Sequence, residues 1–293
     1  VDLARDGFPV AATVDVAWKR AAKKFESQLE AHPESQSWFD CFTKDGRTPD
    51  PFEMWTLPDH ATTLEKIGQT QAKAFYEGDL AEKIAQQSQA DGGYLSLEDL
   101  KNHKPLFVTP IKTNYRGYDI YELPPSNQGL VALMGLNILE NWTFHERNTD
   151  YYHKAFEAMK LAFADGKTYI TDPDCMSVPF ESLLKKSYGQ ERAALITDQA
   201  QDFDAGKPLG NNTVYLATGD KDGNLVSFIQ SNYMGFGSGV VIKGTGISLQ
   251  NRGADFSLDP NHDNVLAGKK KTYHTIIPGM MGKDGEAFAA FGV

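Results

Sequence analysis

A threonine at the start of a predicted β-hairpin carries the most informative chemistry in this chain. Thr213 opens a run of alternating apolar and polar residues, the sequence DKDGN at 220–224 favours a turn, and 225–231 is the predicted return strand. If the backbone is cut before such a threonine, the new α-amino group lies beside the side-chain hydroxyl. The amine can then serve as the base for that hydroxyl, so one residue supplies both nucleophile and base.

The same pattern also fits a surface threonine that opens an ordinary hairpin, because a short motif alone is weak evidence for a site. Sequence blocks elsewhere decide the choice, because together they resemble the γ-glutamyltranspeptidase family in the family's own order. The blocks are LARDGFPV at 3–10, AFYEGDLAEKIAQ at 74–86, DGGYLSLEDLKNHK at 91–104, YRGYDIYELPPSNQGLVALMGLNILE at 115–140, HKAFEAMKLAFADGKTYITDPD at 153–174 and GFGSGVVIKGTGISLQNRGADFS at 235–257.

The resemblance implies a fold and a division of the chain. Members of this family have the α+β, four-layer αββα fold of N-terminal nucleophile (Ntn) hydrolases, and each is made as one polypeptide that cuts itself. On this sequence the cut falls between Asn212 and Thr213. Residues 1–212 then correspond to the C-terminal part of a mostly helical large subunit. Residues 213–293 correspond to the start of a strand-rich small subunit, and the two together form one Ntn-hydrolase domain.

The resemblance also implies an activity, which is γ-glutamyl transfer or glutathione hydrolysis. The Thr213 hydroxyl attacks a γ-glutamyl amide such as glutathione, and its own amine takes the proton. Water, or the amine of an amino acid or peptide, then resolves the acyl-enzyme. No cofactor and no metal ion is expected. The same resemblance places a substrate-binding arginine upstream of Val1 and the paired glycines of the oxyanion hole after Val293.

Two further residues match functional positions of the family. Asp255, in GADFS, corresponds to the aspartate that binds the substrate α-amino group. A carboxylate suits this task because an ammonium group needs an anionic acceptor. Ser231 falls on the hydroxyl position near the amine of the nucleophile. The competing interpretations are a loop aspartate that caps a turn and an ordinary serine at the end of a strand.

Several positions around the substrate depart from the family pattern. The family's asparagine after the second strand aligns with Tyr233, with Asn232 beside it, and its glutamine ahead of the aspartate aligns with Arg252. Its serine pair corresponds to His274 and Thr275. These changes indicate a divergent, acylase-like branch. Arg252 is a candidate for bidentate binding of a substrate carboxylate, which glutamine cannot provide, whereas His274 is either a substrate-binding or a structural histidine.

Two alternatives to γ-glutamyl transfer remain open at this point. A related Ntn amide acylase would act on another carboxylated acyl group, such as a cephalosporin side chain or a glutaryl amide. A non-catalytic homologue would keep the fold as a binding or structural module, and it predicts no self-cleavage.

Composition excludes some classes of partner. The chain has 293 residues, of which 41% are hydrophobic and 23% charged, as in ordinary globular proteins. A net charge of -10 without a basic stripe argues against nucleic-acid binding, and no segment has the length of a transmembrane helix.

The two cysteines argue against a metal site, because Cys41 and Cys175 lie far apart without metal-ligand spacing. Localisation is not predicted, because the first residues resemble the interior of the family's large subunit.

Helical patterns precede strand patterns along the chain. Helices are expected over 11–32, 63–76, 80–89, 127–142 and 151–164, with Ser96 as the cap of a short one. A hairpin is expected over 107–122, and strands dominate after Thr213. The change from helices to strands therefore falls where the resemblance places the processing site.

Overall fold

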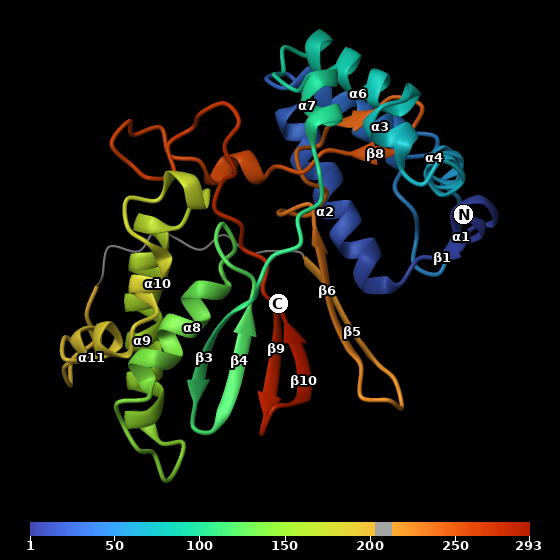
Figure 1. The fold of residues 1–293 in the computed structure, drawn as a ribbon. Coiled ribbons are helices and arrows are strands. Elements are labelled where there is room, and N and C mark those ends of the chain that lie inside the picture. The colour runs from blue at the N-terminus through green and yellow to red at the C-terminus, as the bar shows by residue number, and fades with distance from the viewer. Residues whose placement is uncertain (203–212) are drawn as a thin grey trace. The chain divides into compact units, whose positions relative to one another are not determined.

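The computed structural model describes residues 1–202 and 213–293, which form two compact units (Figure 1). The first unit comprises Val1–Leu106 and Asn232–Asn251, and the second comprises Phe107–Ser231 and Arg252–Val293. Both units contain helices and strands, so the α+β class expected from the sequence is confirmed.

The first unit is mainly helical. Its helices are α1 (Asp2–Asp6), α2 (Ala12–Gln28), α3 (Gln36–Phe42), α4 (Pro58–Gln69), α5 (Lys73–Tyr76), α6 (Asp79–Ala90) and α7 (Leu97–Asn102), with the 3-10 turn η1 (Pro33–Ser35). Two short ladders complete it, which pair β1 (Phe8–Pro9) with β2 (Met54–Trp55) and β7 (Val241–Ile242) with β8 (Ile247–Ser248).

Local backbone chemistry explains where these helices begin and end. The single helix predicted over 63–76 is in fact two helices, because Gln71 and Ala72 adopt positive φ angles of 50° and 68° and break it. The predicted cap at Ser96 is confirmed, since Ser96 and Asp99 form a reciprocal capping box at the start of α7.

An aromatic cluster forms much of the core of the first unit. Trp18, Trp38 and Phe42 pack together, and the indole N–H of Trp18 donates a hydrogen bond of 3.0 Å to the carbonyl oxygen of Phe42. Gly239 has a φ of 82° and lies so close to Phe25 that a Cβ atom would come within 2.5 Å of the ring. A glycine is therefore required here both by the positive φ and by close packing against the core.

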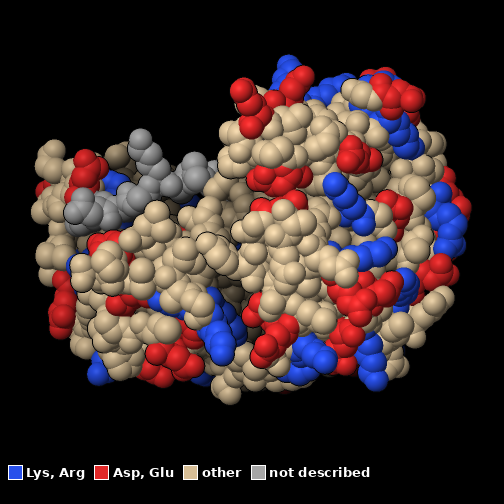
Figure 2. Space-filling view, turned by 90° about the horizontal axis from the view of Figure 1, so that it is seen from above, with Lys and Arg blue, Asp and Glu red and all other residues tan. Residues whose placement is uncertain are grey.

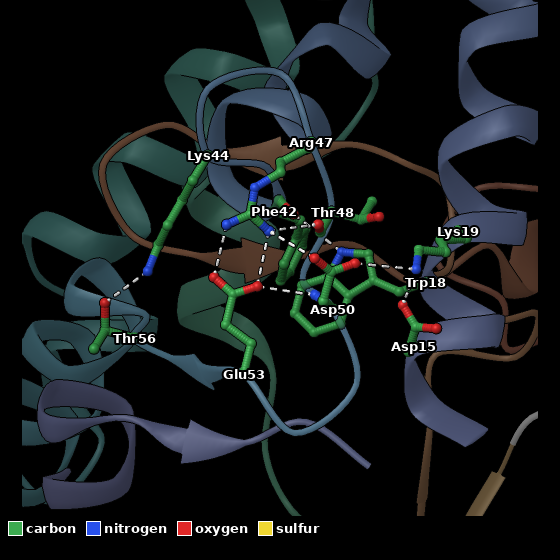
Figure 3. A network of polar contacts seen from close by, with 10 residues as sticks. All are labelled: Asp15, Trp18, Lys19, Phe42, Lys44, Arg47, Thr48, Asp50, Glu53 and Thr56. Atoms are coloured by element: carbon green, nitrogen blue, oxygen red, sulfur yellow. Dashed lines mark hydrogen bonds and ion pairs between the residues drawn. The ribbon is translucent and has the colours of Figure 1, made fainter. Parts of the chain in front are cut away.

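A network of ion pairs holds the loop that precedes β2 in the first unit (Figure 3). Arg47 donates two hydrogen bonds of 2.8 and 2.9 Å to the carboxylate of Glu53, and Lys19 contacts both Asp15 and Asp50. The Arg47 side chain, together with the backbone N–H of Asp50, lowers the pKa of Glu53 to about 2. The bidentate contact between Arg47 and Glu53 fixes the loop geometry more than it adds to the free energy of unfolding, because both side chains are accessible to solvent.

The second unit combines a four-stranded sheet, a hairpin and helices. Its strands are β3 (Ile111–Tyr115), β4 (Tyr118–Glu122), β5 (Thr213–Gly219), β6 (Leu225–Ser231), β9 (Pro278–Lys283) and β10 (Glu286–Gly292). Its helices are α8 (Gly129–Leu139), α9 (Thr149–Tyr169), α10 (Phe180–Leu183) and α11 (Lys186–Ala193), with the 3-10 turns η2 (Pro173–Cys175) and η3 (Arg252–Asp255). The antiparallel sheet has the strand order β10-β9-β4-β3.

Helices and hairpin both pack on this sheet. Apolar residues of α8 and α9, among them Leu130, Met134 and Leu161, form the main buried cluster of the unit. The β5–β6 hairpin contacts β10, where the Ser227 hydroxyl donates a hydrogen bond of 3.2 Å to the carbonyl oxygen of Phe291. The hairpin predicted over 213–231 is confirmed, and the one predicted over 107–122 is confirmed from Ile111 onward, since residues 107–110 lie outside β3.

The two units do not follow the predicted division at residue 213. Strands β3 and β4 precede that point and share one sheet with β9 and β10, which follow it. The expected division into 1–212 and 213–293 concerns covalent subunits rather than compact units, so it remains a prediction.

Charged side chains are mixed over the face shown in Figure 2, where acidic and basic residues alternate without a large patch of one sign. Among the described residues, no helix is both long and apolar enough to cross a membrane.

Glu122 is a buried acid in the second unit. It lies on β4 with 2% of its surface exposed, and its two carboxyl oxygens have no hydrogen-bond partner among the described residues. Gly129 and Gly279 leave room for it, since a Cβ atom on either glycine would lie 2.6 or 2.5 Å from one of these oxygens. Burial raises the pKa of Glu122 to about 8, so the side chain is neutral at pH 7.

We expect Glu122→Gln to flatten the dependence of folding stability on pH. The unfolded state releases the Glu122 proton near pH 4.5 and the folded state near pH 8, so wild-type stability falls between these values. Glutamine keeps the shape and cannot ionise, so the variant should lose this fall, which amounts to a few kcal/mol. Urea unfolding at pH 5 and pH 8 measures it, with the exposed Glu181→Gln as the matched control. An unchanged pH dependence in Glu122→Gln would contradict the assignment.

Candidate active site

The structure places the two hydroxyls expected at the reaction centre side by side. Thr213 is the first residue of β5 and lies directly opposite Ser231, the last residue of β6. The Thr213 hydroxyl donates a hydrogen bond of 3.0 Å to Ser231 Oγ, and both side chains are half-buried. Asn212, on the other side of the expected cleavage, lies outside the described residues. The hydrogen bond holds the Thr213 hydroxyl in a defined direction beside a second hydroxyl.

The turn between the strands sets this pairing. Asp220 accepts hydrogen bonds from the backbone N–H groups of Asp222 (2.9 Å) and Asn224 (3.0 Å), and from the Asn224 side-chain amide (2.8 Å). These bonds lower the pKa of Asp220, and Gly223 supplies a φ of 84° that favours glycine. The turn therefore fixes a register in which Thr213 meets Ser231.

The expected substrate-binding residues form a second cluster, which we call the Asp255 cluster (Arg252, Asp255, His274 and Thr275). Arg252 and Asp255 are the two ends of η3, and the guanidinium Nη1 lies 2.9 Å from the Asp255 carboxylate. The same nitrogen donates a hydrogen bond of 2.8 Å to the Thr275 hydroxyl. Only 4% of the Arg252 side chain is exposed, against 17% for Asp255. Bidentate binding of a substrate by Arg252 would therefore have to replace contacts within the protein.

His274 lies within this cluster as a neutral side chain. Burial, with the nearby Arg252 charge, lowers its pKa to about 4, and Asp255 opposes the shift only in part. Its Nδ1 atom is buried without a hydrogen-bond partner among the described residues. Its backbone pairs with the loop before α8, where it donates to Ser126 and accepts from Gln128. The structural interpretation of His274 agrees with this environment, because a neutral, buried imidazole adds no charge to a site.

Asn264 supports the cluster and was not identified from the sequence. It is 3% exposed, and its amide nitrogen donates a hydrogen bond of 2.7 Å to the carbonyl oxygen of Asp255. Its carbonyl oxygen accepts hydrogen bonds from the Thr171 hydroxyl (2.8 Å) and the Tyr273 N–H (3.3 Å). Asn264 thus ties η3 to the segment that carries His274. An asparagine in a polar loop gives no sequence signal for such a role.

Asn232 and Tyr233 belong to the first unit, unlike the other expected site residues. Asn232 is exposed, and its carbonyl oxygen accepts a hydrogen bond of 3.3 Å from the Asn251 N–H. Tyr233 is buried and has a φ of 79°, which is rare for an aromatic residue and marks a constrained backbone. The roles expected for these two residues remain predictions.

No group of three or more histidine, cysteine, aspartate or glutamate side chains within residues 1–202 and 213–293 is arranged to hold a metal ion. Among the described residues, the candidate site contains two hydroxyls in contact, one ion pair and a neutral imidazole.

Comparison with known proteins decides the family. The model of the family described as gamma-glutamyltranspeptidase matches residues 1–293, the whole chain. The chain belongs to the gamma-glutamyltranspeptidase family. The resemblance stated from the sequence blocks is therefore confirmed.

Individual members of the gamma-glutamyltranspeptidase family differ in the activity that their names give. The chain is 40% identical to the glutathione hydrolase-like YwrD proenzyme of Bacillus subtilis (strain 168), over 99% of this chain and 54% of that protein. It is 36% identical to the oxamate amidohydrolase proenzyme of Klebsiella pneumoniae subsp. pneumoniae, over 98% of this chain and 56% of that protein. The chain thus spans about half the length of these relatives.

A solved structure gives the same fold. The crystal structure of cephalosporin acylase from Bacillus halodurans matches with a TM-score of 0.93 and 49% identity, over 98% of this chain and 53% of that chain. The Ntn-hydrolase fold expected from the sequence is confirmed by such neighbours.

We expect Asn264→Ala to lower the stability of the fold. The change leaves the Thr171 hydroxyl and the Tyr273 N–H without their buried acceptor, which should cost about 2–4 kcal/mol of unfolding free energy. Urea unfolding measures this effect. Asn261→Ala, an exposed asparagine of the same loop, is the matched control and should change stability by no more than about 0.5 kcal/mol. Equal effects of the two substitutions would contradict the role of Asn264.

Proposed function

We propose that Thr213 is the nucleophile of a self-processing amide-bond hydrolase or acyltransferase of the γ-glutamyl type. The observation that carries this proposal is the 3.0 Å contact between Thr213 and Ser231, held at the start of β5 by the hairpin register. Membership in the gamma-glutamyltranspeptidase family supports it, and relatives that are named proenzymes support a precursor cleaved into subunits.

The first step is scission of the bond between Asn212 and Thr213. The Thr213 hydroxyl oxygen bonds to the preceding carbonyl carbon as the peptide C–N bond breaks, and the hydroxyl proton passes to the nitrogen, which becomes a free amine. Water then hydrolyses the resulting ester and frees the hydroxyl. The products are a chain that ends at Asn212 and a chain that begins at Thr213.

The second step is acyl transfer at the new N-terminus. The free α-amino group of Thr213 takes the hydroxyl proton while the oxygen bonds to the carbonyl carbon of a substrate amide, and the leaving amine receives that proton. Ser231 Oγ lies 3.0 Å from Thr213 Oγ1, and this hydrogen bond orients the Thr213 hydroxyl for attack on the substrate carbonyl carbon. Water yields hydrolysis, and the amine of an amino acid or peptide yields transfer. Glutathione and other γ-glutamyl amides are the proposed donors.

The Asp255 cluster is the proposed site for the far end of the acyl group. Its carboxylate and guanidinium are partly desolvated, and a polar site of this kind discriminates strongly between charged and uncharged groups. Asn232 and Tyr233 are proposed as further substrate contacts, on the family's pattern.

A second candidate function is an amide acylase for a carboxylated acyl group without an amine. The pairing of Asp255 with a buried arginine favours it, because a carboxylate that is already paired attracts an ammonium group less. The similarity to a cephalosporin acylase and an oxamate amidohydrolase agrees with such a shift. A non-catalytic homologue would differ from both by leaving the chain uncut.

We expect Thr213→Ala to abolish both self-cleavage and amide turnover, since the variant lacks the attacking oxygen. Thr213→Ser keeps a hydroxyl and should still cleave and turn over a γ-glutamyl anilide, at a reduced rate. Denaturing gel electrophoresis and release of the anilide chromophore measure the two steps. Cleavage at this bond in Thr213→Ala would refute the proposed nucleophile.

We expect Ser231→Ala to lower kcat about tenfold, because loss of one neutral hydrogen bond to the nucleophile corresponds to roughly 1–1.5 kcal/mol. Ser227→Ala, on the same strand and bonded to Tyr215 and β10 instead, is the matched control and should keep kcat within twofold. Equal losses in the two variants would show that Ser231 acts only through the fold.

A further inference from the structure

Glu122 lies where two segments of the second unit meet the sheet. It is the last residue of β4, and its carboxyl group is packed against Gly129, the first residue of α8, and against Gly279, near the start of β9. The residue is 2% exposed, and neither carboxyl oxygen has a hydrogen-bond partner among the described residues. The proposed reaction gives this buried acid no role.

The two segments that flank this acid are paired with each other. Residues 123–128 run from β4 to α8, and residues 273–277 lead into β9. The His274 N–H donates a hydrogen bond of 2.9 Å to the Ser126 carbonyl oxygen, and the His274 carbonyl oxygen accepts one of 2.8 Å from the Gln128 N–H. We call this pair of segments the clamp.

The clamp is connected to the Asp255 cluster. Thr275 belongs to the second segment, and its hydroxyl accepts a hydrogen bond of 2.8 Å from Arg252, which pairs with Asp255 at 2.9 Å. Two residues earlier, the Tyr273 hydroxyl donates a hydrogen bond of 2.8 Å to the side-chain oxygen of Gln128 in the first segment. The placement of the cluster therefore depends on how firmly the two segments are held together.

The surroundings of Glu122 suit a neutral carboxyl group and not a carboxylate. They are uncharged on every element packed around it: Ile111 lies opposite it on β3, Gly129 and Gly279 contact it from α8 and β9, and Phe291 of β10 borders the same space. Burial alone raises its pKa to about 8, so no described charge offsets ionisation there. A carboxylate at this place can regain water only if the segments around it separate.

We infer that Glu122 is a positioning residue, which in its neutral form keeps the clamp closed and so holds Thr275 and Arg252 in place for the substrate. This inference rests on the proposed function, because it takes the Asp255 cluster as the place where the acyl group binds. Ionisation of Glu122 opens the clamp. The substrate then binds only the fraction of molecules in which Glu122 is neutral, which raises KM.

The pH dependence of KM tests this role. The matured full-length protein and its Glu122→Gln variant are compared with γ-glutamyl p-nitroanilide at pH 7 and pH 9, because the ratio of their KM values cancels the titration of the substrate and of the nucleophile amine. About a tenth of the Glu122 side chains are neutral at pH 9, since the pKa is about 8. The ratio of wild-type to variant KM should therefore rise about tenfold between the two pH values.

The corresponding ratio of kcat values should not rise, because the hairpin register and not the clamp positions Thr213. The exposed Glu181→Gln is the matched control, and its KM should follow that of the wild-type protein at both pH values.

Hydrogen exchange reports on the clamp without turnover. The backbone N–H groups of Gln128 and His274 are bonded within the clamp and exchange when it opens. At pH 9, mass spectrometry of peptides that contain them should show exchange at least tenfold faster in the wild-type protein than in Glu122→Gln. The peptide of α7, in the other unit, should exchange equally in both proteins.

The two measurements separate this inference from the proposed function. Faster exchange in a protein that turns over no anilide would support the clamp and overturn the enzyme. Turnover with a KM ratio that stays constant from pH 7 to pH 9, or equal exchange in the two proteins, would overturn the positioning role and keep the enzyme.

A second variant keeps the test decisive if Glu122→Gln does not fold. Tyr273→Phe removes the 2.8 Å hydrogen bond to Gln128 that joins the two segments. It should raise KM about fivefold at pH 7, with the effect on KM rather than on kcat. An unchanged KM in Tyr273→Phe would overturn the inference.

Discussion

The register of the β5–β6 hairpin is the constraint on which the proposed chemistry depends. Side chains alternate between the faces of a strand, so a slip of one residue would turn Thr213 away from Ser231. Three hydrogen bonds to the Asp220 carboxylate and the positive φ of Gly223 fix the turn, and the turn fixes the register. The 3.0 Å contact between the Thr213 and Ser231 hydroxyls therefore depends on the turn sequence at 220–224, at the other end of the hairpin.

The second constraint is the compensation of buried charge. A buried arginine is stable only with a partner, and Arg252 finds one in Asp255 within the same 3-10 turn. Asn264 holds this turn against the segment of His274 through its hydrogen bond to the Asp255 carbonyl. The pairing holds the loop and leaves the Asp255 carboxylate with a cation already beside it, so the fold and the proposed substrate binding depend on the same contact.

Much of the fold was predictable, because the hairpin, the Ser96 cap and most helices arise from local patterns. The break at Gln71 and Ala72 was not, since neither residue is a usual helix breaker. At the site, Thr213, Ser231 and Asp255 were identified through resemblance and strand pattern. The role of Asn264 depends on a hydrogen bond to Thr171, about 90 residues earlier in the chain, which no local pattern reports.

The central claim is that the peptide bond before Thr213 is cut and that this residue becomes a new N-terminus. Intact mass measurement of the purified protein, with N-terminal sequencing of its fragments, tests it most directly. The account predicts a fragment that begins Thr-Val-Tyr-Leu and no remaining full-length chain after maturation. A single uncut chain under assay conditions that support amide turnover, or a cut at another bond, would contradict it.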